Sequence, residues 1–443
     1  MARPSTKDTL DIWINGKLIG HWRVPGRGAM ELVYEPAWTA SEEGRPLSLS
    51  LPFGLDDAPL KGSAVEFYFD NLLPDSDAIR KRVQDRFHTN SRKPFDLLAA
   101  IGRDCVGAIQ LMPPGETPNI RKIDATRLSS QEVERRLAGV VSPDKFRMGE
   151  DDDSFRLSIA GAQEKTAFLW HKEQWCVPHG ATPTTHIFKL PLGMIGNAQV
   201  DMRTSVENEW LCSRILAAYE MPVAQCEMAT FGLQKTLIVE RFDRKLHASG
   251  QYWLRLIQED FCQATGTPSS RKYEEHGGPG MKEIAGLLRG SLERDADLAT
   301  LMKAQILFWM LAAIDGHAKN FSLFLLPGSS YRLTPLYDVL SGWPIIGRGS
   351  NKYQWEKAKL AMAVRGKNKH YKLKDIQRRH FNQTASRIGI GTAEPLMGQL
   401  LTGLPSVISS VQSQIPKHFP QHVLDTVLEG LAHSAERLES MPP

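Results

Sequence analysis

The residues best suited to chemistry lie in one stretch, from Asp315 to Asp338. Asp315 follows an apolar segment typical of a helix, Asn320 comes five residues later, and Asp338 ends the strand-like segment 331–338. An aspartate at a helix end can accept the proton of an attacking hydroxyl, and amide and carboxylate oxygens can hold magnesium. The order and the Asp-to-Asn spacing match the phosphoryl-transfer centres of protein kinases. We therefore predict that Asp315 is catalytic and that Asn320 and Asp338 bind Mg²⁺ in an ATP-dependent phosphotransferase.

A loop upstream of this stretch could contact the phosphates of ATP. Residues 160–165 place small side chains between two strand-like segments, 155–159 and 166–170. Such a loop lets backbone N–H groups approach a phosphate closely. It is not a Walker A loop, because no GxxxxGK[ST] pattern occurs in the sequence.

A lysine and a strand end complete the predicted nucleotide site. Lys189 lies in an otherwise apolar strand, 186–190, as does the phosphate-contacting lysine of kinases. Its carboxylate partner is expected from the helix predicted at 205–219, where Glu207 and Glu209 are candidates and Glu209 is preferred. The apolar strand that ends in residues 240–242 could supply backbone hydrogen bonds to adenine.

The elements that must position these residues fall into three units. Residues 1–150 are expected to be β-rich, with a hairpin around Asn15-Gly16 and a half-buried strand at residues 47–51, where leucines alternate with serines. The acidic run at 150–153 is predicted to be a solvated linker. Residues 151–258 are strand-rich and form the expected nucleotide-binding lobe. Residues 259–443 are predicted to be helical, most clearly at 298–314 and 420–438.

Composition narrows the class of protein. The chain has 443 residues, 42% of them hydrophobic and 23% charged, as in ordinary globular proteins. The net charge of +4 is too even to indicate a nucleic-acid partner by itself. The five cysteines form no CxxC pair, and the N-terminus has no apolar signal-peptide core. A cytosolic protein without a membrane partner is therefore expected.

Taken together, these segments resemble the HipA family of bacterial toxin kinases over nearly the whole chain. Motifs this long, in one order, are highly specific. They read RPLSLSLPF (45–53), FDNLLPDS (69–76), FDLLAAIGRDCVGA (95–108), SIAGAQEKTA (158–167), TPTTHIFKLP (182–191), VERFDR (239–244), GGPG (277–280), DGHAKNFSLF (315–324) and YRLTPLYD (331–338).

The resemblance implies an α+β, two-lobed protein-kinase-like fold related to phosphoinositide kinases, with an extra β-rich N-terminal subdomain and an all-helical C-terminal lobe. It implies a serine/threonine-protein kinase toxin that pairs with a helix-turn-helix antitoxin, HipB, and that binds operator DNA through this complex to repress its own operon. The implied substrate is glutamyl-tRNA synthetase, whose phosphorylation leads to growth arrest and persistence. The implied location is the bacterial cytoplasm, at the nucleoid when in the antitoxin–DNA complex.

The resemblance also assigns individual residues. Asp315 matches the catalytic aspartate of the family, Asn320 and Asp338 match its magnesium ligands, and Ser158 matches its autophosphorylated serine, whose modification expels the phosphate loop and inactivates the enzyme. The implied ATP contacts are Ala160, Gly161, Ala162, Gln163, Glu164, Lys165, Lys189, Glu240, Arg241, Phe242, His317, Ala318, Lys319, Asn320, Tyr337 and Asp338.

One departure from the family concerns DNA. The family's DNA contacts follow the segment matched here by His380–Ala385, where basic residues are expected, but this chain continues Ser386-Arg387-Ile388-Gly389. A basic stretch at 365–379 could contact phosphates instead, but a solvated face or flexible loop is the favoured interpretation.

Three other functions were considered. A non-catalytic module in a repressor complex would be expected to lack one of Asp315, Asn320, Asp338 or Lys189, and all four are present. A small-molecule kinase would share the ATP-binding residues, so these motifs do not exclude it. A metallohydrolase is poorly supported, because no HExxH or close His/Cys cluster occurs.

Overall fold

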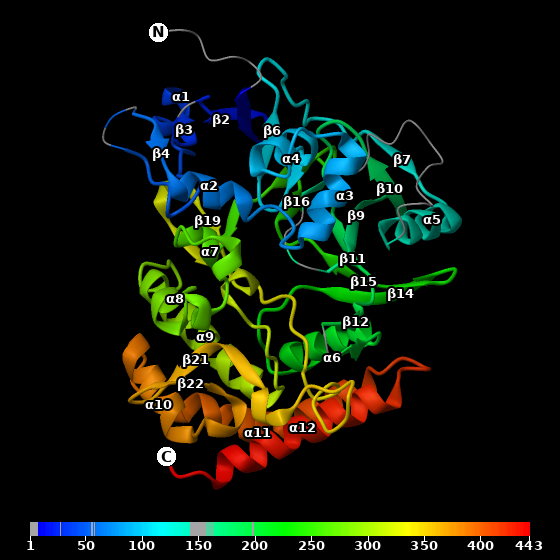
Figure 1. The fold of residues 1–443 in the computed structure, drawn as a ribbon, viewed down its shortest axis with the longest axis vertical. Coiled ribbons are helices and arrows are strands. Elements are labelled where there is room, and N and C mark those ends of the chain that lie inside the picture. The colour runs from blue at the N-terminus through cyan, green and yellow to red at the C-terminus, as the bar shows by residue number, and fades with distance from the viewer. Residues whose placement is uncertain are drawn as a thin grey trace.

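The computed structural model describes residues 8–26, 28–54, 56, 58–141, 157–158, 161, 163–196 and 199–443, with only the backbone at 141, 157 and 158. Figure 1 shows three regions along the long axis. The N-terminal subdomain lies at one end, the strand-rich lobe next to it, and the helical lobe at the other end, where the chain finishes. The fold is mixed α+β with the expected two-lobed kinase-like arrangement.

The N-terminal subdomain is a five-stranded sheet in the order β4-β3-β2-β1-β6, covered by helices. The predicted hairpin is confirmed: β1 and β2 pair antiparallel across Asn15 and Gly16, whose φ values of 48° and 78° suit a tight turn. Trp22 stacks on Phe69 of α2 in the buried core. The elements are β1 (Thr9–Ile14), β2 (Lys17–Arg23), β3 (Glu31–Tyr34), α1 (Pro36–Thr39), β4 (Leu60–Lys61), α2 (Ser63–Asp70), α3 (Asp77–Phe87), α4 (Pro94–Ile101) and β6 (Ile109–Met112).

The strand predicted at residues 47–51 is wrong, because this segment forms turns. Leu47 and Leu51 are buried, as the alternation indicated. The hydroxyls of the intervening Ser48 and Ser50 bond to Glu259 and Gln263 of the C-terminal lobe, however, and make no strand ladder. Ser48 is itself buried and Leu49 is only half-buried, so the alternation predicted neither the full burial pattern nor the backbone pairing.

The nucleotide lobe is built on a six-stranded antiparallel sheet in the order β14-β15-β11-β9-β10-β7. The helix predicted at 205–219 is confirmed as α6, which is buried on most of its surface because the sheet covers one side and α11 and α12 the other. The strands are β7 (Ala125–Arg127), β9 (Lys165–His171), β10 (Gln174–Pro178), β11 (His186–Lys189), β14 (Cys226–Phe231) and β15 (Gln234–Glu240), and the helices are α5 (Ser130–Val141) and α6 (Ser205–Ala218).

Two elements that precede the expected boundary at residue 150, β7 and α5, pack with the lobe that follows it. β7 pairs with β10, and Val133 and Leu137 of α5 pack in one core with Phe168 and Phe188. Packing therefore assigns residues 125–141 to the nucleotide lobe. The smaller pairs are β5 (Asp104–Cys105) with β8 (Leu157–Ser158), β12 (Gly193–Ile195) with β13 (Val200–Met202), and β16 (Arg244–Leu246) with β17 (Trp253–Arg255).

The C-terminal lobe is mainly helical rather than wholly helical, because it also carries a three-stranded sheet and a hairpin. Its apolar helix α9 is buried along its length and forms the centre of the largest core. The elements are β18 (Gln258–Asp260), α7 (Phe261–Ala264), α8 (Met281–Leu288), α9 (Arg294–Met310), β19 (Ser322–Leu325), β20 (Tyr331–Leu333), β21 (Lys359–Arg365), β22 (Lys369–Lys372), α10 (Arg378–Ile388), α11 (Glu394–Ser413) and α12 (Gln421–Ser440).

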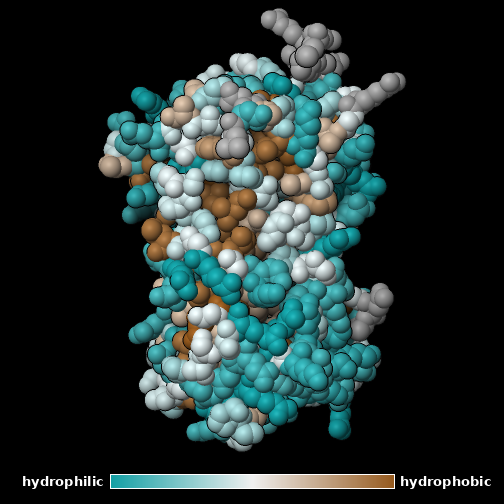
Figure 2. Space-filling view, turned by 90° about the vertical axis from the view of Figure 1, so that its left-hand side faces the viewer, coloured by the Kyte–Doolittle hydropathy of each residue, from teal (hydrophilic) through white to brown (hydrophobic). Residues whose placement is uncertain are grey.

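The two ends of the molecule also differ in how hydrophilic their surfaces are. Figure 2 shows that the side of the molecule on the left in Figure 1 is mostly hydrophilic over the helical end, while apolar residues gather in the opposite half. No helix in the described ranges is long and apolar enough to cross a membrane. All five cysteines are buried and free.

Candidate active site

The segment after α9 folds into a turn that gathers the predicted catalytic residues. A short 3₁₀ turn, Ala318–Asn320, follows Asp315, and the Asn320 amide donates to the Asp315 backbone oxygen over 2.8 Å. This bond leaves the amide oxygen of Asn320 available to a cation. Asp338 follows β20 with φ at 60°, a left-handed conformation that is unusual for a residue other than glycine.

Lys189 is buried between two carboxylates. Its Nζ lies 2.6 Å from Glu209 Oε1 and 2.7 Å from Asp338 Oδ1. The lysine on β11 therefore joins helix α6 of the nucleotide lobe to the predicted metal-binding aspartate of the C-terminal lobe. Of the two glutamates that the sequence offered, Glu209 makes this contact, while Glu207 pairs with Lys235.

The charges in this triad shift one another's pKa values. Burial opposes the ionisation of Asp338, but the charges of Lys189 and Lys165 outweigh it and hold its pKa well below the usual range. Burial likewise opposes the charge on Lys189, yet Asp338 and Glu209 raise its pKa. Burial raises the pKa of Glu209 to about 7; the charge of Asp338 adds to this effect, and the charge of Lys189 opposes it.

These groups line a cavity of about 220 Å³ between the lobes. Lys165, at the start of β9, is half-buried in its wall, and the loss of solvent lowers the pKa of its ammonium to about 8. A bound anion would counter that loss of charge. The cavity residues named by the sequence are Gly161, Gln163, Lys165, Lys189, Glu240, Arg241, Phe242, Asp315, His317, Lys319, Asn320, Tyr337 and Asp338.

Other predicted residues lie elsewhere. Ala160 and Ala162 fall outside the described residues, and only the backbone of Ser158 is described, in β8. Glu164 does not line the cavity and instead pairs with Arg82 of the N-terminal subdomain. Ala318 is buried beneath the turn rather than on the cavity wall.

Lys319 lines the cavity, but its ammonium is already bonded. It donates to Asn71 O at 3.0 Å, to Asn71 Oδ1 at 2.9 Å and to Asp260 Oδ2 at 2.7 Å. A lysine ammonium has three donors, so none remains for a phosphate. The contacts of Lys319 are therefore structural ones that join the catalytic turn to α2 and β18.

The predicted adenine hinge follows β15. The Arg241 N–H donates to Thr185 O, and the Arg241 guanidinium turns away into a buried ion network with Asp243 and Asp104. The ring of Phe242 lies 5.7 Å from that of Tyr337. Glu240, Arg241 and Phe242 line the cavity, where Phe242 contributes an aromatic ring.

The sequence did not reveal several residues at the site. The Tyr273 hydroxyl donates to Asp315 Oδ1, and its ring lies edge-on to His317 at 5.1 Å. Asn71 and Asp75 of the N-terminal subdomain also line the cavity. In the part of the chain that the structure describes, Asp75 Oδ1 and His317 Nδ1 are buried without a hydrogen-bond partner. No local spacing signals these contacts, because their residues are distant along the chain.

The donor set fits magnesium rather than a transition metal. Asn320 and Asp338 offer hard oxygen ligands on one wall of the cavity, and magnesium typically takes one or two carboxylates together with phosphate and water. Within the described ranges, no group of three or more His, Cys, Asp or Glu side chains could hold a metal by itself. A cation at Asn320 and Asp338 would therefore need a ligand, such as a phosphate, to complete its coordination.

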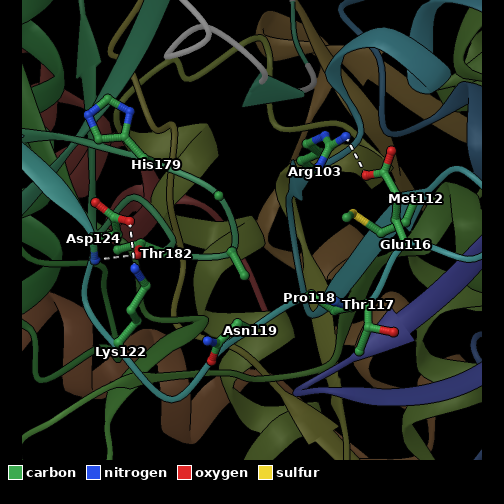
Figure 3. A pocket seen from close by; sticks show the side chains of 12 residues that line it. Arg103, Met112, Glu116, Thr117, Pro118, Asn119, Lys122, Asp124, His179 and Thr182 are labelled. Carbon is green, nitrogen blue, oxygen red and sulfur yellow. Dashed lines mark hydrogen bonds and ion pairs between the residues drawn. The ribbon is translucent and has the colours of Figure 1, made fainter.

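A second cavity, of about 260 Å³, lies apart from these residues, between the end of β6 and the loop after β10. Figure 3 shows that its charged side chains form two pairs, one on each side of the opening. Arg103 pairs with Glu116 and Lys122 with Asp124. These pairs leave little unmatched charge for a ligand.

Known proteins share this architecture. The chain matches the model of the HipA-like C-terminal domain at residues 157–413 and that of the HipA N-terminal domain at residues 10–112. It is 30% identical over 406 residues to "Putative kinase Y4mE" of Sinorhizobium fredii, covering 90% of each chain. It is 29% identical over 343 residues to the serine/threonine-protein kinase toxin HipA of Shewanella oneidensis, covering 75% of this chain and 72% of the relative.

A solved structure extends the likeness to the whole fold. The Shewanella oneidensis HipA chain in a complex with HipB and operator DNA has a TM-score of 0.78 to this chain. The two are 22% identical, and the match covers 98% of each.

Proposed function

This chain belongs to the HipA family, and from that premise we propose that it is an ATP- and magnesium-dependent serine/threonine-protein kinase. The observation that carries the proposal is the position of Lys189. It pairs with Asp338 in the same cavity that holds Asp315 and Asn320. A buried lysine between two carboxylates, facing a predicted base and metal site, is the arrangement that phosphoryl transfer requires.

Each residue has a role in this proposal. Asp315 accepts or orients the proton of the substrate hydroxyl, and Tyr273 holds one of its oxygens. Asn320 and Asp338 would hold magnesium, which neutralises charge on the phosphates. Lys189, Lys165 and the loop at 160–165 bind the phosphates, and Glu240–Phe242 binds adenine. Positioning and electrostatic stabilisation supply most of the rate.

The first experiment compares the wild type with Asp315→Asn. Both proteins are treated with a phosphatase, incubated with magnesium and ATP, and examined by peptide mapping. We expect phosphate on Ser158 in the wild type only, while both proteins bind ATP, since Asp315→Asn removes the base and keeps the cavity. Normal transfer by the folded variant would refute the role of Asp315. ATP binding without protein phosphorylation by the wild type would favour a small-molecule kinase or a binding module.

We further infer a toxin that acts with a HipB-like antitoxin and reaches operator DNA through it. The Shewanella oneidensis structure, which contains HipA, HipB and operator DNA, supports this inference by its shared fold. The proposed substrate is glutamyl-tRNA synthetase, and the proposed consequences are operon repression, growth arrest and persistence. The location would be the cytoplasm, at the nucleoid when DNA is bound. Co-expression with a cognate antitoxin that fails to restore growth would contradict this assignment.

Direct DNA contact at residues 386–389 lacks support, because the sequence there offers Arg387 where several basic residues are expected. The Arg387 guanidinium also donates to the Gly366 backbone oxygen at 2.8 Å. In the neighbouring basic stretch, Arg378 pairs with Glu394 and Lys369 with Glu274. These pairs neutralise part of its charge, and we propose that DNA contact comes mainly through the antitoxin.

We also propose three structural units with revised limits. The N-terminal subdomain ends between β6 and β7, because β7 and α5 pack with the nucleotide-lobe sheet. The nucleotide lobe then runs to residue 258, and the C-terminal lobe spans 259–443. Hydrogen exchange of the full chain tests the first limit: peptides from β7 and α5 are expected to exchange together with those of β9 and β10, and exchange in step with β1 and β6 would contradict it.

A further inference from the structure

The segment between α2 and α3 has no assigned role in the reaction, yet its backbone meets the phosphate loop. Pro74 forms an isolated parallel bridge with Gly161. The N–H of the next residue, Asp75, donates to the Gly161 oxygen over 3.2 Å. Gly161 has φ at 107°, a conformation that suits glycine and few other residues. The N-terminal subdomain therefore supplies a backbone partner to the middle of this loop.

The same subdomain also holds both ends of the loop. At its start, β8 pairs in parallel with β5, so that Ser158 lies opposite Cys105. At its end, Arg82 of α3 forms an ion pair with Glu164. This pair directs the Glu164 carboxylate away from the cavity. Inside the cavity, its negative charge would repel the phosphates of a nucleotide. Contacts at three points along residues 157–164 thus come from a region outside the kinase lobes.

Asn71 and Asp75 connect these contacts with the phosphate loop to the turn at Ala318–Asn320. Asn71 accepts two hydrogen bonds from the Lys319 ammonium. Asp75 Oδ2 lies 2.8 Å from Lys272 Nζ, and the Lys272 backbone oxygen accepts the Ala318 N–H. One short segment therefore contacts both the phosphate loop and the turn that carries Asn320, and it fixes the separation of the two.

We propose that residues 71–82 clamp the phosphate loop in its nucleotide-binding position, with Arg82 acting through Glu164 as a positioning residue. The proposal rests on the proposed function and adds to it a role for the N-terminal subdomain. A short glycine-containing loop loses conformational freedom when it binds phosphates. A clamp that orders the loop beforehand removes part of that loss from the free energy of binding. It also keeps the negative charge of Glu164 away from the nucleotide.

The test measures ATP affinity in the full chain by displacement of a fluorescent ATP analogue in the presence of magnesium. Arg82→Gln is expected to weaken ATP binding about fivefold, the effect of losing one partly exposed ion pair. Glu164→Gln removes the same pair, so adding it to Arg82→Gln should cause no further loss. The reversed pair, Arg82→Glu with Glu164→Arg, should regain most of the affinity.

The control is Lys81→Ala, whose exposed side chain pairs with Asp85 on the same helix. It should bind ATP like the wild type. Hydrogen exchange gives a second measurement. The amide groups of the peptide that contains the phosphate loop and the start of β9 should exchange faster in Arg82→Gln than in Lys81→Ala. Equal affinity and exchange in Arg82→Gln and the control, or no recovery in the reversed pair, would overturn the clamp.

The two proposals fail in different ways. The affinity measurement does not require phosphoryl transfer, so a wild type that binds ATP without phosphorylating protein would refute the kinase and leave the clamp standing. A wild type that phosphorylates protein, with an Arg82→Gln variant that binds ATP normally, would refute the clamp alone.

Discussion

Tyr273 is the residue at the site with the clearest untested role. Its hydroxyl donates to Asp315, and burial together with the nearby Asp315 charge raises the pKa of Tyr273 well above its usual value. The hydroxyl therefore remains a donor throughout the range in which the enzyme would work. It can hold one oxygen of Asp315 and leave the other to the substrate hydroxyl.

Tyr273→Phe should therefore lower kcat about tenfold, the cost of one hydrogen bond to a charged group, with little change in the KM for ATP. The reason is that the nucleotide contacts stay in place while the base loses its orientation. Steady-state kinetics at saturating protein substrate would measure both constants. Tyr331→Phe is the matched control, because that hydroxyl donates to Leu287 O away from the cavity. Equal losses in both variants would rule out a specific role for Tyr273.

Single residues at the site were predictable where a short motif carries them. Asp315 and Asn320 stand in one hexapeptide, and a lone lysine in an apolar strand identified Lys189. Tyr273 lies 42 residues from Asp315, and Asn71 lies 248 residues from Lys319. The structure brings such pairs together through packing of whole elements, and no local spacing encodes that packing.

At the scale of elements, the contact between the turn at 47–51 and strand β18 explains both a failed prediction and a pH effect. Ser48 Oγ donates to Glu259, and the Leu49 N–H donates to Glu259 Oε1 over 2.9 Å. Ser48, expected on the outer face of a strand, is instead a partner of this buried carboxyl group, and Ser50 donates to the Gln263 backbone oxygen. Burial raises the pKa of Glu259 to about 8, against the lowering effect of these two hydrogen bonds.

This shift predicts how stability changes with pH. The pKa of Glu259 is higher in the folded chain than its ordinary value of 4.5, so the folded chain binds an extra proton between those values. Its contribution is fully present below about pH 4.5 and is lost as the pH rises towards 8. The free energy of unfolding should fall by up to about 1.4 kcal/mol per pH unit from this group.

Glu259→Gln should reduce that slope, because the amide keeps the shape of the carboxyl group and does not titrate. Urea unfolding at several pH values from 5 to 8 measures the slope in each protein. Glu429→Gln, an exposed change on α12, serves as the control and should follow the wild type. A slope in Glu259→Gln as steep as in the control would show that Glu259 titrates normally.

The whole molecule is joined by a buried cluster of charges centred on Asp104. This aspartate of β5 accepts from Arg244 Nη2 at 2.9 Å and Arg255 Nη2 at 3.3 Å, and from Thr184 Oγ1 at 2.7 Å. Arg241, in the predicted hinge at residues 240–242, completes the cluster. The N-terminal subdomain is thereby tied to the nucleotide lobe at the back of the hinge.

The family motifs contain these residues, but nothing in the motifs indicates that the residues contact one another. Arg241 and Arg244 lie in VERFDR at 239–244, and Asp104 lies in the motif at 95–108. Arg241 was expected to contact ATP. Its guanidinium instead donates to the Cys105 backbone oxygen and to Asp243, so that the side chain is turned away from the predicted nucleotide site. No local pattern in the sequence indicates this joint, because its residues come from segments far apart along the chain.

Asp104→Ala should destabilise the chain strongly, by about 3–5 kcal/mol, because it leaves buried guanidinium groups without their shared partner. Burial opposes the charge of Asp104, but Arg244, Arg241 and Arg255 outweigh it and hold its pKa well below the usual range. Its contribution is therefore present at neutral pH and lost only in strong acid. Urea unfolding at pH 7 measures the loss, with Asp77→Ala, an exposed partner of Arg92, as the control. If the cluster joins the subdomain to the lobe, Asp104→Ala should also separate one unfolding transition into two, whereas a single unshifted transition would contradict both expectations.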